Sequence, residues 1–279
     1  MNKDYLELED LTVSFDGFLA VDGVSLSVLP GELRFLIGPN GAGKTTVLDA
    51  VSGLVGCTGS ARYAGHELVG RKVHRINRLG VGRTFQTATV FEGLSVLQNL
   101  DIAAGSGRTP LTLLRRRSSV PREVAETLDT IGLTELADQP AGVLAHGQKQ
   151  WLEIGMLLVQ NARLLMLDEP VAGMSHEEKD ETGRLLQRLA ADRTVVVVEH
   201  DMDFMRSFAT SVTVLHTGKV LAEGSVTEVQ ADRRVQEVYL GPGYSREEAE
   251  AVFSGAAGAD LASPAGADFA SPAGVDGGR

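Results

Sequence analysis

The stretch GPNGAGKTT, from Gly38 to Thr46, has the residue types and spacing of a phosphate-binding loop. It fits the pattern G-x-x-x-x-G-K-[ST] and lies between a short apolar strand pattern and a helical pattern, as such loops do. Glycines let the backbone wrap closely and turn its N–H groups toward phosphate oxygens, while Lys44 adds a mobile charge and Thr45 a hydroxyl ligand for Mg²⁺. The predicted nucleotide-binding residues of the loop are Gly38, Pro39, Asn40, Gly41, Ala42, Gly43, Lys44, Thr45 and Thr46.

Two adjacent acids, Asp168 and Glu169, follow the apolar run LLML. Charges at the end of a buried strand are costly unless they have a use. At the carboxyl end of a strand beside a nucleotide, Asp168 can orient the ligands of Mg²⁺, and Glu169 can act as general base on the attacking water. The alternative is that both acids only cap the helix that follows. The phosphate loop earlier in the chain favours the catalytic interpretation.

Gln86, in GRTFQ, and His200, in VVVVEHD, are the other candidate catalytic residues. A single glutamine or histidine is more often structural than catalytic. Here, each follows a segment that is expected to end at the same edge of the sheet as the phosphate loop. Gln86 is therefore predicted to contact Mg²⁺ and the water, and His200 is predicted to contact the γ-phosphate.

The elements that must position these residues alternate between strand and helix patterns. The apolar runs Arg163–Leu167 and Thr194–Val198 predict two buried strands, and helical patterns cover Lys44–Val51 and Glu177–Ala190. The dipeptide Thr217-Gly218 marks a hairpin turn near the end of the ordered region. Alternation on this scale predicts an α/β fold with a mainly parallel sheet.

The remaining segments differ in character along the chain. Apolar and polar residues alternate within 5–37, as in half-buried strands, whereas 87–143 is mostly helix and loop in pattern. Near the end, AGADLASP at 257–264 recurs as AGADFASP at 265–272. This small, polar, Pro- and Gly-rich composition predicts a disordered tail over 255–279.

The bulk composition excludes several classes of protein. The chain has 279 residues and 43% hydrophobic residues, which fits a soluble globular protein, and no run approaches the roughly 18 apolar residues of a membrane-spanning helix. Its formal net charge of −11 argues against a general nucleic-acid binder. A single cysteine, Cys57, excludes a disulfide framework within the chain and favours a reducing compartment.

In combination and order, these motifs resemble those of the ATP-binding subunits of ABC transporters over about residues 5–240. The resemblance implies a P-loop NTPase fold of the ABC ATPase type, with a mainly parallel core sheet, an antiparallel β subdomain and a helical subdomain at about 87–160, all within an ATP-binding domain of 1–254. It implies an ATPase with ATP and Mg²⁺ as cofactors. It also implies that Phe15 stacks on adenine, although an ordinary core aromatic is the alternative.

The same resemblance makes Leu144–Gln148 the ABC signature, which contacts the ATP of a partner subunit through Ala145, His146, Gly147 and Gln148. Alanine stands where the family has serine, so a hydroxyl for the γ-phosphate is missing. We expect His146 to compensate through a ring N–H. Ser175 likewise replaces the usual acid or amide of the D-loop.

An apolar stripe follows the signature at helical spacing, at Leu152, Met156 and Val159. It predicts that 149–159 is a helix packed in the core. The signature is thus expected to lie at the start of a buried helix.

Several stretches resemble importers of the branched-chain amino-acid type: RTFQ, LSVLQNL, the AGM after the second acid pair, and VQEVYLG. The stretches HGQKQWLEIGMLL and LDEPVAGM resemble more closely the ATPase that serves bacterial uptake of urea and short-chain amides. The resemblance implies a dimer with a second ATPase subunit, homomeric or, as we favour, heteromeric. It further implies transmembrane permease partners, an indirectly coupled solute-binding protein, and a location at the cytoplasmic face of the cell membrane.

Two other functions remain as alternatives. A stand-alone ABC ATPase of DNA repair or translation is disfavoured by the single cassette and the acidic charge. A regulatory module that binds nucleotide without hydrolysis is disfavoured by the presence of Glu169 and His200, although the altered signature favours it.

Overall fold

The computed structural model describes residues 5–85, 89–105 and 120–240, and the structural statements below concern these residues. The chain divides into two units, Met1–Gly243 and Tyr244–Arg279, of which the second lies outside the described residues. Gln86 and the predicted tail at 255–279 lie outside them as well.

An antiparallel sheet opens the chain, in the strand order β2-β1-β4-β5. Its strands are β1 (Leu6–Phe15), β2 (Phe18–Val28), β4 (Thr58–Tyr63) and β5 (His66–Glu67). In the second half of β2, buried residues alternate with exposed ones, so one face of this strand packs on the core. The predicted strand pattern of 5–37 is therefore confirmed, with the third strand of that range belonging to the second sheet.

The second sheet has six strands in the order β10-β9-β3-β8-β7-β6. They are β3 (Leu33–Ile37), β6 (Val81–Arg83), β7 (Leu164–Asp168), β8 (Thr194–Val198), β9 (Ser211–His216) and β10 (Lys219–Gly224). All neighbours pair in parallel except β9 and β10, which form the hairpin predicted around Thr217-Gly218. The strands β3, β7 and β8 are buried along their whole length, and their sequences are mostly apolar rather than alternating, with one polar residue each at Arg34, Asp168 and Thr194.

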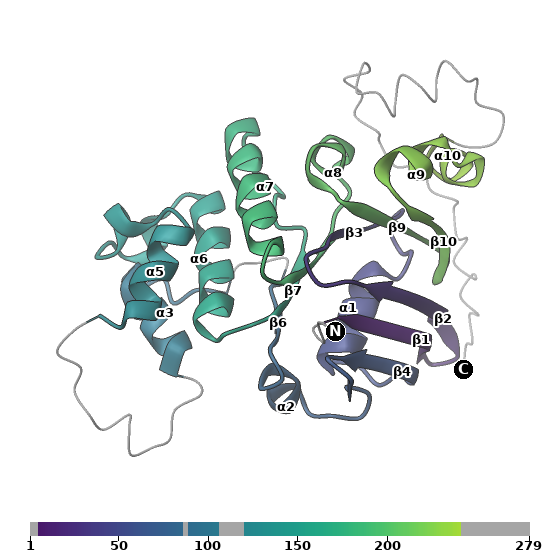
Figure 1. Ribbon diagram of the computed structural model, residues 1–279, viewed down its shortest axis with the longest axis horizontal. Helices are drawn as coiled ribbons and strands as arrows, with labels where there is room; N and C mark the ends of the chain where they lie inside the picture. Colours follow the sequence, from purple (N-terminus) through teal and green to yellow (C-terminus); the bar gives the residue numbers. More distant parts are fainter. Residues whose placement is uncertain (1–4, 86–88, 106–119, 241–279) are drawn as a thin grey trace, which may run out of the picture. The chain divides into compact units, whose positions relative to one another are not determined.

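The helices of the described residues connect and cover these strands. They are α1 (Lys44–Ser52), α2 (Val73–Asn77), α3 (Val96–Gly105), α5 (Arg122–Thr130), α6 (His146–Val159), α7 (His176–Ala190), α8 (Met202–Phe208), α9 (Val226–Ala231) and α10 (Arg233–Leu240). Helices α3 and α5 both pack on α6, and Figure 1 shows the three as one helical group. They fall within the range 87–160 that the sequence assigned to a helical subdomain.

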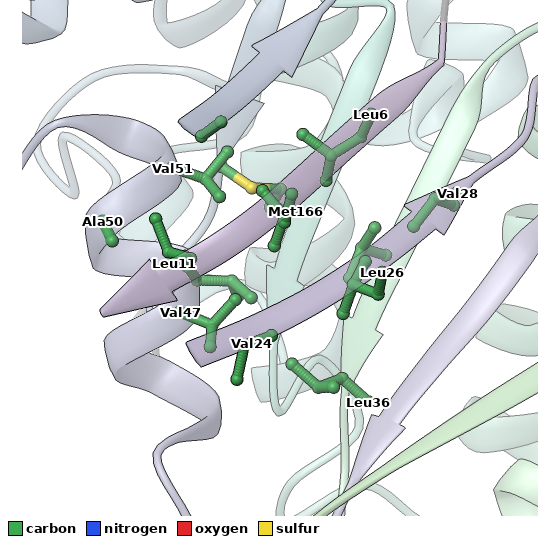
Figure 2. Packing of buried hydrophobic residues seen from close by; sticks show 14 of the residues in the cluster. Leu6, Leu11, Val24, Leu26, Val28, Leu36, Val47, Ala50, Val51 and Met166 are labelled. Atoms are coloured by element: carbon green, nitrogen blue, oxygen red, sulfur yellow. The ribbon is translucent and has the colours of Figure 1, made fainter. Parts of the chain in front are cut away.

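The main core lies between the antiparallel sheet, helix α1 and the parallel sheet. Figure 2 shows Leu11 of β1, Leu26 of β2, Val47 of α1 and Met166 of β7 gathered in this cluster. Burial of this apolar surface fixes α1 between the two sheets. Since α1 begins at Lys44, within the phosphate loop, the core also fixes the position of the loop.

Three predicted elements differ from the structure by one residue at an end. The helix predicted at Lys44–Val51 runs to Ser52, with Gly53 as its C-cap. The strand predicted at Arg163–Leu167 is Leu164–Asp168, because Asp168 pairs in register with Val198 instead of leaving the sheet. The helix predicted at Glu177–Ala190 begins at His176, because the Ser175 hydroxyl caps it by accepting from the Glu178 N–H at 3.3 Å. The predicted strand Thr194–Val198 is confirmed.

Candidate active site

The phosphate loop joins β3 to α1. Neighbouring backbone leaves room only for glycine at two of its positions, and the conformation of the loop itself favours glycine at a third. Gly38, Gly41 and Gly43 all have positive φ, of 147°, 79° and 96°. A Cβ on Gly38 would clash with the Leu215 carbonyl oxygen, and one on Gly43 would clash with the Ala20 carbonyl oxygen. Gly41 has open space around its Cα, so only its backbone conformation favours glycine there. The result is a tight backbone cradle at the N-terminus of a helix, which is the form of an anion site.

Lys44 turns back over this cradle. Its Nζ donates to the carbonyl oxygens of Gly38 at 2.8 Å and Pro39 at 3.1 Å, and the residue is only 8% exposed. Burial lowers the pKa of Lys44, while the nearby Glu169 and Asp168 carboxylates act to raise it. The ammonium group is thus held at the loop, where phosphate oxygens would replace the two carbonyls as its partners.

Asp168 lies at the carboxyl end of β7 and is 1% exposed. Its Oδ1 accepts from the Thr45 hydroxyl at 3.3 Å, and its Oδ2 lies 3.3 Å from the Arg83 guanidinium. Burial raises the pKa of Asp168, and Arg83 and Thr45 counteract this by favouring the carboxylate. A hydroxyl and a carboxylate oxygen side by side are hard donors that suit Mg²⁺.

A magnesium site of this kind needs few protein ligands. Within the described residues, no group of three or more His, Cys, Asp or Glu residues could hold a metal by itself. Magnesium in nucleotide-binding proteins is held through one or two protein oxygens together with phosphates and waters. The pair Thr45 and Asp168 fits that arrangement.

Glu169 and His200 meet at the same edge of the sheet. Glu169 has a left-handed backbone, with φ 50°, and its N–H donates to the Val198 carbonyl oxygen at 2.9 Å. Its Oε1 lies 3.6 Å from the His200 Nδ1, and the side chains are 29% and 62% exposed. Both groups are therefore accessible to a nucleotide and to water, unlike the buried Asp168.

Glu199 was not singled out from the sequence, although it precedes His200. It is 1% exposed, and its carboxylate accepts from the N–H groups of Val171 at 3.2 Å and His200 at 3.1 Å. Burial raises its pKa, and these hydrogen bonds act to lower it. It ties the turn that carries His200 to the segment after Glu169. An acid directly after four consecutive valines was the only available signal.

Phe15 ends β1 and pairs with Phe18 across the turn Asp16-Gly17. Its side chain is 47% exposed, which does not fit an ordinary core aromatic. An exposed aromatic face is available for stacking, so adenine contact by Phe15 stays a prediction.

The signature lies at the start of α6, as its sequence predicts. Ala145 is the N-cap residue, and Gln148 Oε1 accepts from the Ala145 N–H at 3.0 Å. A serine would also accept from the Gln148 N–H, whereas the methyl group of alanine cannot, so the reciprocal pair is only half formed. Ala145 and His146 are exposed, and Gly147 is buried against Glu178.

The helix behind the signature is part of the core. Leu152 and Val159 are buried as predicted, and Met156 is half-buried. In the described part of the chain, no hydrogen bond or ion pair joins residues 144–148 to residues 38–46. The signature thus makes no direct polar contact with the phosphate loop of its own chain.

Comparison with known proteins identifies the family. The ABC transporter family model matches residues 21–172, and a model described as branched-chain amino acid ATP-binding cassette transporter matches residues 219–241. This chain belongs to the ABC transporter family. It is an ABC ATPase, and its predicted fold class is confirmed.

Relatives of this ATPase match over most of their length. It is 37% identical to the high-affinity branched-chain amino acid transport ATP-binding protein BraF of Pseudomonas aeruginosa, over 86% of this chain and 99% of the relative. It is 35% identical to LivG of Escherichia coli K12 over the same shares. The crystal structure of an ATP-binding cassette of an ABC transporter in its ADP conformation is 30% identical, with a TM-score of 0.74, over 85% of this chain and 99% of the other.

A second buried acid of the ATPase, Glu153 on α6, was also missed by sequence reasoning. It is 5% exposed, its Oε1 accepts weakly from the Thr89 N–H at 3.5 Å, and its Oε2 has no hydrogen-bond partner among the residues that the structure describes. Burial raises the pKa of Glu153 from 4.5 to about 7, against the lowering effect of the backbone N–H groups of Thr89 and Phe85. A carboxyl group this poorly paired is favoured in its neutral form.

We expect Glu153→Gln to stabilise the ATPase at pH 8 but much less at pH 5. The unfolded chain loses this proton near pH 4.5 and the folded chain near pH 7, so the wild type loses stability as pH rises between those values. The neutral amide avoids that loss, which is on the order of 3 kcal/mol at pH 8. Thermal unfolding of both proteins from pH 5 to pH 8 measures the difference. Glu126→Gln, at an exposed acid on α5, is the control, and equal pH profiles for all three proteins would contradict the expectation.

Proposed function

We propose that this ATPase hydrolyses ATP at the edge where the phosphate loop, Asp168, Glu169 and His200 meet, and that hydrolysis drives a solute importer. The observation that carries the proposal is the accessible Glu169 carboxylate, which lies 3.6 Å from His200 and directly follows the buried Asp168, the partner of the half-buried Thr45. A base, a metal carboxylate and a phosphate cradle at one sheet edge are the parts that phosphoryl transfer to water needs.

Each side chain has a separate task in this proposal. Lys44 and the loop N–H groups bind the β- and γ-phosphates, and Thr45 with Asp168 would hold Mg²⁺. When bound, the metal supplies charge neutralisation between the phosphates. Glu169 accepts the proton of the attacking water. His200, which lies next to the Glu169 carboxylate, orients the γ-phosphate. Gln86 stays a proposed contact to Mg²⁺ and the water.

We infer that the working unit is a head-to-tail dimer, because the signature of this chain makes no polar contact with its own phosphate loop. The start of α6 presents backbone N–H groups, and a helix N-terminus attracts phosphate. In a dimer, Ala145, His146, Gly147 and Gln148 would thus contact the ATP held by the partner subunit. The partner is a second ATPase, with a heterodimer favoured over a homodimer.

The membrane partners follow from the same proposal. None of the described helices combines the length and the apolarity needed to cross a membrane. Opening and closing of the dimer would bias transmembrane permease subunits between two states, with the ATPase bound peripherally at the cytoplasmic face of the cell membrane. A solute-binding protein would be coupled only indirectly, through the permease.

For the solute, we propose urea or a short-chain amide first and a branched-chain amino acid second. The first choice is supported by the stretches HGQKQWLEIGMLL and LDEPVAGM. The second is supported by relatives that are named for branched-chain amino-acid transport and by the model matched at 219–241. Measurement of transport decides between the two.

Reconstitution with the permease subunits in vesicles tests both the proposed ATP hydrolysis and the proposed solute. Inorganic phosphate release measures hydrolysis, and uptake of labelled urea, acetamide and leucine measures the solute. Hydrolysis with leucine uptake alone would overturn the first choice of solute. ATP binding without any phosphate release in the presence of the permease would overturn the ATPase mechanism and favour a regulatory module.

Two substitutions in the signature test the contributions of Ala145 and His146 separately. Ala145→Ser should increase ATP-dependent dimerisation, because the hydroxyl completes the cap of α6, worth about 1 kcal/mol, and offers a hydrogen bond to phosphate. His146→Ala should lower ATPase activity, because a donor to the γ-phosphate is lost. Light scattering with ATP and a phosphate-release assay measure the two effects. If neither variant differs from the wild type, His146 is only a spacer.

A further inference from the structure

Arg83 ends β6, next to the strand that carries Asp168, and its side chain is only 6% exposed. Its Nη1 lies 2.5 Å from Asp49 Oδ1 and 3.3 Å from the Ser52 hydroxyl, both on α1. Its Nη2 lies 3.3 Å from Asp168 Oδ2. One buried guanidinium thus joins the helix of the phosphate loop to the proposed magnesium carboxylate.

The contacts of Asp168 divide between its two oxygens. Oδ2 receives Arg83, whereas Oδ1 receives the Thr45 hydroxyl. Because a guanidinium is planar and its nitrogens are fixed relative to one another, anchoring one nitrogen on Asp49 also fixes the direction of the other. The Asp168 carboxylate is thereby held with Oδ1 toward Thr45, the side on which Mg²⁺ would bind.

A fourth contact of Arg83 comes from Phe85, two residues further along the chain. The guanidinium carbon lies 5.2 Å from the centre of the Phe85 ring, a cation–π geometry. Removing one partner of the buried guanidinium leaves the remaining charges less well compensated, so a substitution at Arg83 or at Asp49 also affects Asp168.

We propose that Arg83 is a positioning residue for magnesium, acting through Asp168 and anchored by Asp49. The proposal rests on the role of Asp168 given above. Residues that orient a metal ligand without touching the metal typically change its affinity by 10- to 100-fold when they are replaced. Arg83→Gln should therefore raise the Mg²⁺ concentration needed for tight nucleotide binding by at least about tenfold.

The test measures binding of a fluorescent ATP analogue to the purified ATPase over a range of Mg²⁺ concentrations, together with thermal unfolding without nucleotide. Arg34→Gln is the matched control. Arg34 is similarly buried, with 8% of its side chain exposed, and pairs with Glu32 at 2.6 Å and Glu223 at 3.2 Å. It should lower the unfolding temperature without changing the Mg²⁺ requirement.

Asp49→Asn keeps Arg83 but weakens its anchor, so it should raise the Mg²⁺ requirement less than Arg83→Gln. If Arg83→Gln does not fold, Arg83→Lys and Asp49→Asn take its place, because both retain buried polar groups there. A Mg²⁺ requirement that equals the wild type in the folded variants, with only a lowered unfolding temperature, overturns the positioning role.

The variant Asp168→Asn distinguishes failure of the inference on Arg83 from failure of the proposed function. If Asp168→Asn removes the Mg²⁺ dependence of nucleotide binding and the Arg83 and Asp49 variants leave it unchanged, only the inference on Arg83 fails. If wild-type binding is independent of Mg²⁺, or Asp168→Asn leaves its dependence intact, the proposed magnesium site fails and the inference with it.

Discussion

Replacement of Glu169 by glutamine should reduce ATP hydrolysis by about 10²- to 10⁴-fold while ATP binding stays close to that of the wild type. The amide keeps the size of the carboxylate but cannot accept the proton of the attacking water. Binding depends on other residues, since Lys44 and the loop backbone form the phosphate cradle. Single-turnover phosphate release and fluorescent-nucleotide binding measure the two quantities separately.

The same variant should accumulate an ATP-bound dimer, because hydrolysis is the step that reopens the proposed dimer. Size-exclusion chromatography with light scattering, in the presence of ATP and Mg²⁺, detects this species. Glu177→Gln, at an exposed acid in the first turn of α7, is the charge-matched control and should hydrolyse like the wild type. Full activity in Glu169→Gln would place the general base elsewhere.

The phosphate loop and the acid pair were predictable because their signals are local. Glycine spacing, one lysine and an apolar run ending in two acids each fall within ten consecutive residues. The parallel order of β3, β8 and β7 then brings the ends of these runs to one edge. The boundary error at Asp168 arose because a carboxylate suggests the end of a strand, whereas ladder pairing with Val198 keeps it in the sheet.

The contacts of Arg83 could not be predicted, because its partners are distant in sequence. Asp49 lies 34 positions away and Asp168 lies 85 positions away, and only the packing of α1 against β6 and β7 unites them. Glu153 was missed for a similar reason. An acid within an apolar helix pattern looks exposed until the neighbouring segment at Thr89 covers it.

The alanine of the signature, Ala145, has one expected effect that the sequence indicates and a second effect that the structure shows. From the sequence, the resemblance to ABC ATPases implies that Ala145 lacks a hydroxyl that a serine would offer to the γ-phosphate. In the structure, the same position caps α6, and Gln148 completes only one of the two reciprocal hydrogen bonds. A single substitution thus affects both the phosphate contact and the stability of the first turn that presents the N–H groups.

Gly43→Ala should weaken ATP binding by more than tenfold, the second large effect that we expect. A Cβ at this position would clash with the Ala20 carbonyl oxygen of β2, and its φ of 96° disfavours any L side chain. Backbone cannot yield as a flexible side chain can, so the start of α1 must move away from β2. That displaces Lys44 and the N–H groups that bind phosphate, and a loss of about 1.4 kcal/mol already corresponds to tenfold in affinity.

Gly41→Ala is the matched control, because Gly41 has φ 79° but open space around it. Gly41→Ala should add a backbone strain of about 1–2 kcal/mol to the folded protein and should leave α1 in place. Fluorescent-nucleotide binding and thermal unfolding of both variants distinguish the effect of backbone strain from the effect of the steric clash with β2. Equal losses in the two variants would mean that the left-handed backbone alone shapes the cradle. A much larger loss in Gly43→Ala means that contact between the loop and β2 of the antiparallel sheet holds the phosphate site in place.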